Sequence, residues 1–368
     1  MRICHLTSVH YRYDTRILLK EAVSAVEAGH EVYLVVNDNL EDEVNRGVVI
    51  KSIHANNKGR LSRIFSMKIK RELLKQATRI NADIFQFHDP ELLGLGNKLR
   101  RRGYNVIYDV HEDVPRQILY KEYLPKLVRG LVSKSFEVYE NQSAKKYNSI
   151  VVPTPYLKNR FSKLNNSVWE VCNFPRKDDI RFAPEKYDNQ NPSCYVGGLS
   201  EIRGIREISE ATQVAGQELV LCGEFVPESF REQILGKFNN VDYRGQINRE
   251  AISNVLINSS MGFVTLLGTP NDYYAYPIKM FEYMAAGIPV IASNFPLYKE
   301  IVEGNSCGIC VNPTNVTEIV DAIKRIQSDA EYAKSLGSQG RKAIEEKYSW
   351  EQQIPNLLEC YHGVMSSK

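Results

Sequence analysis

The segment from Tyr274 to Val290 combines charged residues, a proline and a glycine at spacings that suit a phosphorylated ligand. Pro277 fits the first turn of a helix that Gly287 would end. Lys279 and Glu282 are three residues apart and therefore share a face of that helix. A first-turn lysine makes sense where an anion also binds, and the Glu282 carboxylate can accept two ribose hydroxyls. An ordinary surface ion pair between the two explains the spacing equally well.

Polar residues also follow the apolar runs that we expect to form parallel strands in the first half of the chain. Asp14 and Arg16 come after the first run, His88 after a later one, and His111 and Glu112 after the next. Because the carboxyl ends of parallel strands meet at one sheet edge, these side chains are expected to gather there. Such a group suits the capture of a sugar or similar polyol. His111 is favoured as functional because polar residues flank it on both sides.

Helix capping and metal binding remain open as alternative roles for these loops. Asp14 and Asp89 stand where an aspartate ordinarily caps a helix. His88, Asp89, His111 and Glu112 together could instead ligate a metal ion. We nevertheless expect the protein to use neither a metal nor any other cofactor.

A glycine pair marks a third candidate site. Gly197 and Gly198 directly follow a predicted strand, so the backbone there can pass close to a ligand. Arg203 stands near the start of the next helix, and a cation beside a helix N-terminus binds phosphate well. The loop is neither the Gly-x-Gly-x-x-Gly dinucleotide fingerprint nor a Walker loop. A surface arginine without a ligand remains the alternative.

The elements that must position these residues follow a repeated pattern of short apolar run, loop and amphipathic stretch. This pattern is typical of βαβ units around a parallel sheet. Predicted strands span residues 2–7, 31–36, 83–87, 105–110, 149–152, 193–196, 218–222, 241–243, 262–266, 289–292 and 308–311. Predicted helices include residues 15–28 and 278–286.

The sequence thus predicts an α/β protein with two Rossmann-like doubly wound domains facing each other across a cleft. The N-terminal domain spans residues 1–172 and is joined by a C-terminal helix at 351–368. The polar, proline-containing stretch 173–192 is predicted as the linker, and residues 193–350 form the C-terminal domain. Ligands of such sheets bind beyond the carboxyl ends of the strands.

Charge and cysteine content indicate which ligands, redox state and cellular location to expect. The 368 residues carry a net charge of +3, which does not favour nucleic acid, but residues 51–150 hold 20 basic and 10 acidic residues. That asymmetry indicates an anionic ligand or surface, or a solvated charged face. An odd count of 7 cysteines favours reduced thiols, and Cys307-x-x-Cys310 fits a buried strand better than a redox or metal motif. Without a long apolar run the chain is predicted to be cytoplasmic, with peripheral attachment to the inner face of the cell membrane as a hypothesis.

The segment Pro277–Val290, with the pattern Pro-x-Lys-x-x-Glu-Tyr-Met-Ala-x-Gly-x-Pro-Val, resembles the donor-site helix of family 4 glycosyltransferases of the GT-B fold. The loop from Gly197 to Gly204 is similar to the family's glycine loop with its following basic residue. The pieces around Gly223 and Gly245 resemble later strand ends. Residues 14–16 and 109–112 resemble a bacterial surface-polysaccharide branch, so the resemblance covers nearly the whole chain.

This resemblance implies a retaining transfer of a hexose or N-acetylhexosamine from a nucleoside diphosphate, with UDP favoured, to an acceptor hydroxyl in polysaccharide, lipopolysaccharide or capsule synthesis. It implies that Arg203 and Lys279 neutralise the diphosphate, and that His111 touches the donor sugar near the reacting carbon. The donor-binding residues it implies are Gly197, Gly198, Gly223, Gly245, Gln246, Tyr276, Pro277 and Glu282. The acceptor-side residues are Asp14, Arg16, His88 and Glu112.

Two positions depart from the family pattern. Tyr274 stands where many members have the first glutamate of a Glu-x₇-Glu pair, and Gly198 stands where many have arginine. Lys279 is expected to replace the missing phosphate cation. Asp-x-Asp, the metal–diphosphate motif of the other main glycosyltransferase fold, is absent from the sequence.

The basic amphipathic stretch 58–75 is the candidate membrane contact, since apolar residues alternate there with lysine and arginine. A crossover helix with a solvated face explains it equally well. A nucleotide-sugar epimerase and a non-catalytic nucleotide-sugar binder remain alternatives to the transferase. A nicotinamide-dependent dehydrogenase is disfavoured, because residues 7–16 contain no glycine.

Overall fold

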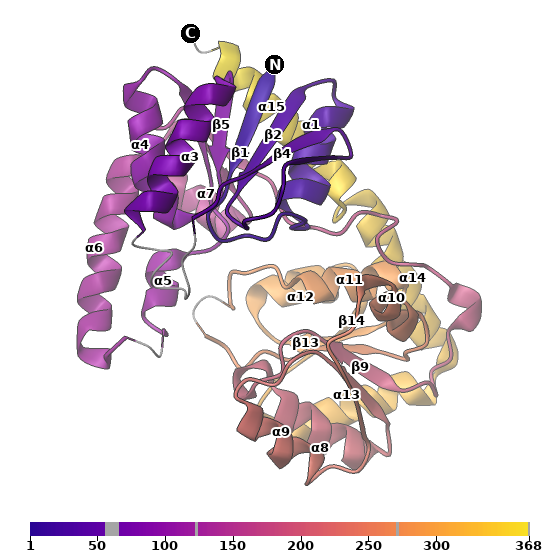
Figure 1. The fold of residues 1–368 in the computed structure, drawn as a ribbon. Coiled ribbons are helices and arrows are strands. Elements are labelled where there is room, and N and C mark those ends of the chain that lie inside the picture. Colours follow the sequence, from indigo (N-terminus) through magenta and orange to yellow (C-terminus); the bar gives the residue numbers. More distant parts are fainter. Residues whose placement is uncertain (56–65, 122–123, 270–271, 367–368) are drawn as a thin grey trace. The chain divides into compact units, whose positions relative to one another are not determined.

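The chain divides into two units, each built on one β-sheet (Figure 1). The computed structural model describes residues 1–55, 66–121, 124–269 and 272–366. Unit 1 comprises Met1–Asn173 with Gln353–Lys368, and unit 2 comprises Phe174–Gln352. Two α/β units with parallel sheets confirm the predicted fold class.

Unit 1 contains an eight-stranded sheet in the order β3-β4-β2-β1-β5-β6-β7-β8. Neighbouring strands are parallel except for β3 and β4. The strands are β1 (Arg2–Leu6), β2 (Glu31–Val36), β3 (Glu43–Asn45), β4 (Val48–Ser52), β5 (Ile84–Phe87), β6 (Asn105–Asp109), β7 (Ser149–Val152) and β8 (Val168–Glu170). The helices are η1 (Ile17–Ala22), α1 (Val23–Glu27), α3 (Met67–Ile80), η2 (Pro90–Leu92), α4 (Leu93–Arg101), α5 (Val114–Ile118), α6 (Lys126–Ala144), α7 (Pro155–Ser162) and α15 (Ile354–Ser366).

The two faces of this sheet differ in chemistry. Side chains alternate along a strand, so Cys4 and Leu6 face the apolar core formed with α3 and α4, whereas His5 points to the opposite face. On that opposite face the Tyr361 hydroxyl of α15 donates to Gln86 of β5 over 2.8 Å. The sheet therefore keeps its apolar core on one side and a buried polar network on the other.

Unit 2 contains a six-stranded parallel sheet in the order β11-β10-β9-β12-β13-β14. The strands are β9 (Ser193–Val196), β10 (Leu219–Cys222), β11 (Val241–Gly245), β12 (Gly262–Val264), β13 (Val290–Ser293) and β14 (Gly308–Val311). The helices are η3 (Pro184–Lys186), η4 (Glu201–Arg203), α8 (Ile205–Ala215), α9 (Glu228–Leu235), α10 (Arg249–Ile257), α11 (Ile278–Ala286), α12 (Pro296–Val302), α13 (Val316–Ser328), α14 (Ala330–Glu346) and η5 (Trp350–Gln352). Its core lies between the sheet and α8, α9 and α13.

Predicted and observed elements differ in three places. The short strands β3, β4 and β8 were not predicted from the sequence, and Arg46 and Gly47, both at positive φ, join β3 to β4. The predicted helix at 15–28 begins with a π-helical stretch, η1. Most of the predicted linker, residues 173–192, belongs to unit 2, where the Phe174 ring packs 4.7 Å from that of Phe281.

All seven cysteines are free thiols, and only Cys310 is partly exposed. Burial raises the pKa of Cys307 to about 12, so this thiol is protonated at neutral pH. Within the described ranges, none of the helices combines the length and hydropathy needed to cross a bilayer. The predicted basic stretch 58–75 lies partly outside the described residues, since 58–65 are not described; its second part forms the first half of α3.

Candidate functional site

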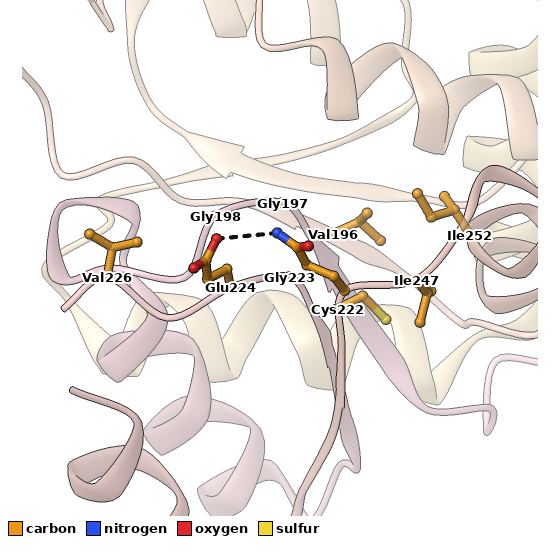
Figure 2. A pocket seen from close by; sticks show the side chains of 10 residues that line it. Val196, Gly197, Gly198, Cys222, Gly223, Glu224, Val226, Ile247 and Ile252 are labelled. Atoms are coloured by element: carbon orange, nitrogen blue, oxygen red, sulfur yellow. Dashed lines mark hydrogen bonds between the residues drawn. The ribbon is translucent and has the colours of Figure 1, made fainter. Parts of the chain in front are cut away.

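Three glycine-containing loops border a cavity of about 410 Å³ in unit 2 (Figure 2). Gly197 follows β9, Gly223 follows β10, and Gly245 ends β11. The cavity therefore lies at the carboxyl ends of parallel strands, where open α/β sheets bind their ligands. It is lined by Val196, Gly197, Gly198, Cys222, Gly223, Glu224, Val226, Gln246, Ile247 and Ile252.

Backbone packing between these loops explains two of the glycines. A Cβ atom on Gly223 would lie 1.9 Å from the carbonyl oxygen of Gly197, which no side chain could tolerate. Gly197 has φ 129 and Gly223 has φ 147, a region that side chains rarely adopt. At these two glycines the wall of the cavity is thus main chain, so a ligand can approach the backbone closely there.

Lys279 lies behind the first of these loops. The helix α11 begins after Pro277, and the Lys279 ammonium reaches back so that Nζ lies 3.6 Å from the centre of the Tyr195 ring. A Cβ on Gly197 would be 3.0 Å from Nζ. The ammonium is buried and has no hydrogen-bond partner among the described residues. An unpaired buried cation is costly unless an anion joins it.

The charge of Arg203 influences both Lys279 and Tyr195. Burial lowers the pKa of Lys279 well below its usual range, and the nearby Arg203 guanidinium lowers it further, with Glu282 opposing. Burial raises the pKa of Tyr195 to about 12, against the influence of Arg203. Arg203, at the end of η4, therefore lies close to both residues, and the two predicted phosphate cations meet around one tyrosine ring.

Glu282 has a partner that the sequence did not indicate. Its Oε1 accepts a hydrogen bond of 2.6 Å from Nη1 of Arg249, the first residue of α10. Lys279 and Glu282 are both buried, so the alternative of a surface ion pair between them is wrong. Nothing in the sequence indicated Arg249 as the partner of Glu282, because Arg249 begins an ordinary helix more than thirty residues earlier in the chain.

The remaining donor-side predictions are distributed around the cavity and α11. Gln246 donates to Glu224 over 3.2 Å, the dashed line in Figure 2. Tyr276 is half-buried and packs against Phe174 and Phe281 with ring centres 5.5 and 5.8 Å away. A Cβ on Gly198 would meet no atom within 4 Å.

In unit 1, Asp109 at the end of β6 is the centre of a buried cluster. Its Oδ1 accepts from Nη2 of Arg16 over 2.8 Å, and Oδ2 accepts from His88 and His111 over 2.8 and 2.9 Å. Burial alone would raise the pKa of Asp109, but Arg16 and the two histidines outweigh it and hold this pKa well below its usual range. The carboxylate stays ionised and fixes the ring of His111. The sequence pattern contained Asp109 but did not assign it a role.

The cluster continues into the polar face of the sheet. Nδ1 of His5 lies 3.0 Å from Nε2 of His88, and the two rings stack. Gln86 donates to Glu21 over 2.7 Å. Burial and the Asp109 charge raise the pKa of Glu21 well above its usual range, although Arg16 opposes them. Glu21 thus holds its proton more firmly than Asp109 does, although Nε of Arg16 lies 2.9 Å from its Oε1.

The two predicted helix-capping aspartates behave differently. Asp14 accepts hydrogen bonds of 2.9 Å from the amides of Arg16 and Ile17, which is a capping geometry. Burial raises its pKa, but His10 and the Ile17 amide prevail and lower it to about 2. Asp89 instead binds the hydroxyl of Thr7 and both the amide and hydroxyl of Ser8, so its side chain joins two strand ends.

Metal-ligand atoms do meet in unit 1, but in a different set from the one considered in the sequence. Within the described part of the chain the groups are His88–Asp109–His111 and His5–Glu21–His88. Glu112 is exposed and belongs to neither group, and Asp89 is bound to the Thr7–Ser8 loop.

Family models match both halves of the chain. "Glycosyltransferase Family 4" matches residues 16–171, and "Glycosyl transferases group 1" matches residues 176–343. An uncharacterised glycosyltransferase of Methanocaldococcus jannaschii is 25% identical over 209 residues, 55% of this chain and 51% of that protein. A GDP-mannose-dependent phosphatidylinositol monomannoside mannosyltransferase of Mycobacterium tuberculosis is 29% identical over 96 residues, 26% of this chain and 25% of that protein. The chain thus spans about half or less of the length of these curated relatives.

Solved structures share the fold. Sucrose-phosphate synthase of Thermosynechococcus elongatus has a TM-score of 0.81 at 16% identity, with both chains fully covered. The HepE protein of Anabaena, solved with UDP-glucose, has a TM-score of 0.72 at 15% identity, again over both whole chains. At these identities the likeness shows the GT-B fold, in agreement with the sequence prediction.

Proposed function

Since its two halves carry the domains of the family 4 and group 1 glycosyltransferases, we propose that this chain moves a sugar from a nucleoside diphosphate to an acceptor hydroxyl. The observation that supports it best is the buried, unpartnered ammonium of Lys279 beside Arg203, directly behind the Gly197 loop. Two cationic side chains beside a loop without side-chain bulk form a site for a diphosphate.

The leaving diphosphate is the difficult part of such a transfer. The bond from the anomeric carbon to the phosphate oxygen breaks, and negative charge grows on the phosphate. Preorganised cations aimed at that charge stabilise the transition state more than the ground state. We assign this role to Arg203 and Lys279, which act in place of a metal ion.

The stereochemistry we propose is retention. The acceptor oxygen bonds to the anomeric carbon on the face that the diphosphate leaves, and the departing phosphate oxygen takes the hydroxyl proton. An oxocarbenium-like centre develops at the reacting carbon, as in glycoside hydrolysis. Proton NMR of the product, read at the anomeric signal, distinguishes retention from inversion.

Unit 1 supplies the sugar and acceptor contacts in this proposal. On the family resemblance, His111 contacts the transferred sugar, while Asp14 and Glu112 remain candidates for the acceptor. Arg16 and His88 are buried against Asp109. We therefore assign these two the positioning of His111 through Asp109, in place of direct acceptor contact.

For the donor we propose UDP carrying a hexose or N-acetylhexosamine, used in polysaccharide, lipopolysaccharide or capsule synthesis. The Anabaena neighbour was solved with UDP-glucose, which supports UDP, whereas the mycobacterial relative is named for GDP-mannose. A thermal-shift screen of nucleoside diphosphates and their sugars decides between the bases, because a ligand of the folded state raises Tm with affinity and concentration. Stabilisation by GDP and not UDP would reject the UDP assignment.

Turnover of variants tests the proposed phosphate cations. Lys279→Ala and Arg203→Ala should each lower turnover by about 10²-fold or more. Lys237→Ala, a change at an exposed lysine of unit 2, is the matched control and should leave turnover unchanged. Addition of a metal chelator should also leave turnover unchanged. Near-normal turnover in both site variants would reject the phosphate role.

A further inference from the structure

Helix α6 of unit 1 exposes an apolar face. Leu127 is 98% exposed and Leu131 is 71% exposed, values far above those of ordinary surface leucines. Val128, Val132, Val138 and Tyr139 are exposed on the same helix. At 3.6 residues per turn these six positions occupy one continuous side of α6. A contiguous apolar surface of this kind marks an interaction site.

The opposite side of α6 is firmly attached to unit 1, so the apolar face points away from it. The Ser133 hydroxyl donates 2.7 Å to the Pro115 carbonyl of α5, and Glu137 pairs with Arg116 of that helix. Glu140 pairs with Arg160 of α7 over 2.5 Å. Figure 1 shows α6 at the outer side of unit 1, next to α4 and α5.

The charges of α6 indicate what covers this face. Its two acidic residues, Glu137 and Glu140, lie on the attached side and are paired with arginines. Lys134 lies beside the exposed leucines and is itself exposed, and Lys126 begins the helix. The exposed side therefore combines leucine and valine with lysine and carries no acid among its described residues.

From this combination we propose that α6 docks on an anionic lipid bilayer, lying flat with Leu127 and Leu131 inserted among the acyl chains and Lys134 at the headgroups. An amphipathic helix of this composition binds in the interface plane through buried apolar area and attraction to anionic lipid. Pairing with a second copy of the chain is less well matched, since the exposed side of α6 offers lysine but no acid to pair with it across a twofold interface.

The docked surface lies close in sequence to the site of unit 1. The helix α5, which packs on α6, begins three residues after His111. An acceptor that carries a lipid anchor would thus be presented near the residues proposed to bind it. This last step rests on the proposed function; the docking itself does not.

Sedimentation with lipid vesicles tests the docking without donor or acceptor. The full chain is mixed with vesicles of phosphatidylcholine, alone or with phosphatidylglycerol, at low and high salt. We expect sedimentation with the phosphatidylglycerol vesicles that weakens as salt rises. The double variant Leu127→Ser and Leu131→Ser should bind at least about tenfold more weakly, and Lys134→Gln should weaken mainly the salt-dependent part.

A matched double variant, Val44→Ser and Val214→Ser, removes two other exposed apolar side chains, and its vesicle binding should equal that of the parent. Thermal melting confirms that each variant is folded. Absence of sedimentation by the folded parent at low salt, or equal sedimentation by the Leu127 and Leu131 variant, overturns the proposal. A fall in molar mass by light scattering in that variant, with unchanged lipid binding, also overturns it and assigns the face to self-association.

Discussion

The ammonium nitrogen of Lys279 lies 3.6 Å from the centre of the Tyr195 ring, a contact that offsets part of the cost of burying it. A cation over an aromatic face gains about 2 kcal/mol when desolvated, which is less than the cost of burying an ammonium. This cost of burial lowers the pKa of Lys279, and the nearby Arg203 charge lowers it further. A bound diphosphate would offset both effects, so the resting site favours binding of an anion.

Binding of UDP should therefore take up protons. The pKa of Lys279 lies well below its usual range in the free protein, and an adjacent diphosphate raises it. At a pH between the two values, part of the lysine population gains a proton on binding. Calorimetry in buffers of different ionisation enthalpy measures this uptake. Lys279→Met should abolish it, and an equal uptake in that variant would locate the proton elsewhere.

Gly198→Arg should strengthen donor binding. No atom lies within 4 Å of a Cβ at this position, so the backbone accepts a side chain there. The added guanidinium would reach the Gly197 side of the cavity and contribute a charge-assisted hydrogen bond to phosphate, for a gain of up to about tenfold in affinity. Titration of UDP gives the value. Gly223→Arg is the contrasting change, since its Cβ would clash with Gly197 and should unfold unit 2.

Asp109 and Glu21 should respond oppositely to amide replacement. Asp109→Asn removes one of the two buried carboxyl groups that pair with Arg16, the other being Glu21, and should cost about 3 kcal/mol or more. Because the pKa of Glu21 is raised, Glu21→Gln, which mimics the protonated acid, should cost less than about 1 kcal/mol. Denaturant unfolding measures both. Similar losses in the two variants would contradict the assigned charge states.

The pH dependence of stability follows from the same two carboxyls. The pKa of Asp109 is lowered on folding, so its contribution is present above the unfolded range near 4 and is lost as pH falls. The pKa of Glu21 is raised, so the folded state holds an extra proton above that range and stability declines as pH rises toward the raised value. Glu21→Gln should flatten the decline on the alkaline side. An unchanged profile would contradict a neutral Glu21.

Arg249 and Glu282 should act as a unit in donor binding. Their hydrogen bond of 2.6 Å holds the carboxylate in place. If Glu282 binds the donor ribose as expected from the sequence, Glu282→Gln should weaken UDP binding by about tenfold. Arg249→Ala should weaken it less, and the double variant should resemble Glu282→Gln alone. Fully additive losses would show that the two residues act independently.

The sequence predicted those features whose signal is local. The helix at 278–286 was predicted to the residue, because Pro277 and Gly287 mark its two ends. Most strands that follow a glycine or precede a polar loop begin and end within one or two residues of their predicted positions. The hairpin of β3 and β4 was not predicted, since its strands are short and lie at the edge of the sheet.

Long-range pairings could not be predicted. Arg249 meets Glu282 and Arg16 meets Asp109 only because strands and helices distant in the chain come together. Arg16 and His88 were predicted on the acceptor side because both follow predicted strands. Their burial, however, depends on how η1 and β6 pack, and no local pattern encodes that packing.

The seven free thiols can be used to detect changes in the conformation of the chain. Cys4, Cys172 and Cys360 lie in unit 1, and the other four lie in unit 2. Because all but Cys310 are buried, a thiol reagent should modify Cys310 first, although burial raises the pKa of this thiol as well, and should reach the rest only when their surroundings open. Mass spectrometry of the modified peptides would then show, from a single untagged sample, which half of the molecule a nucleotide protects.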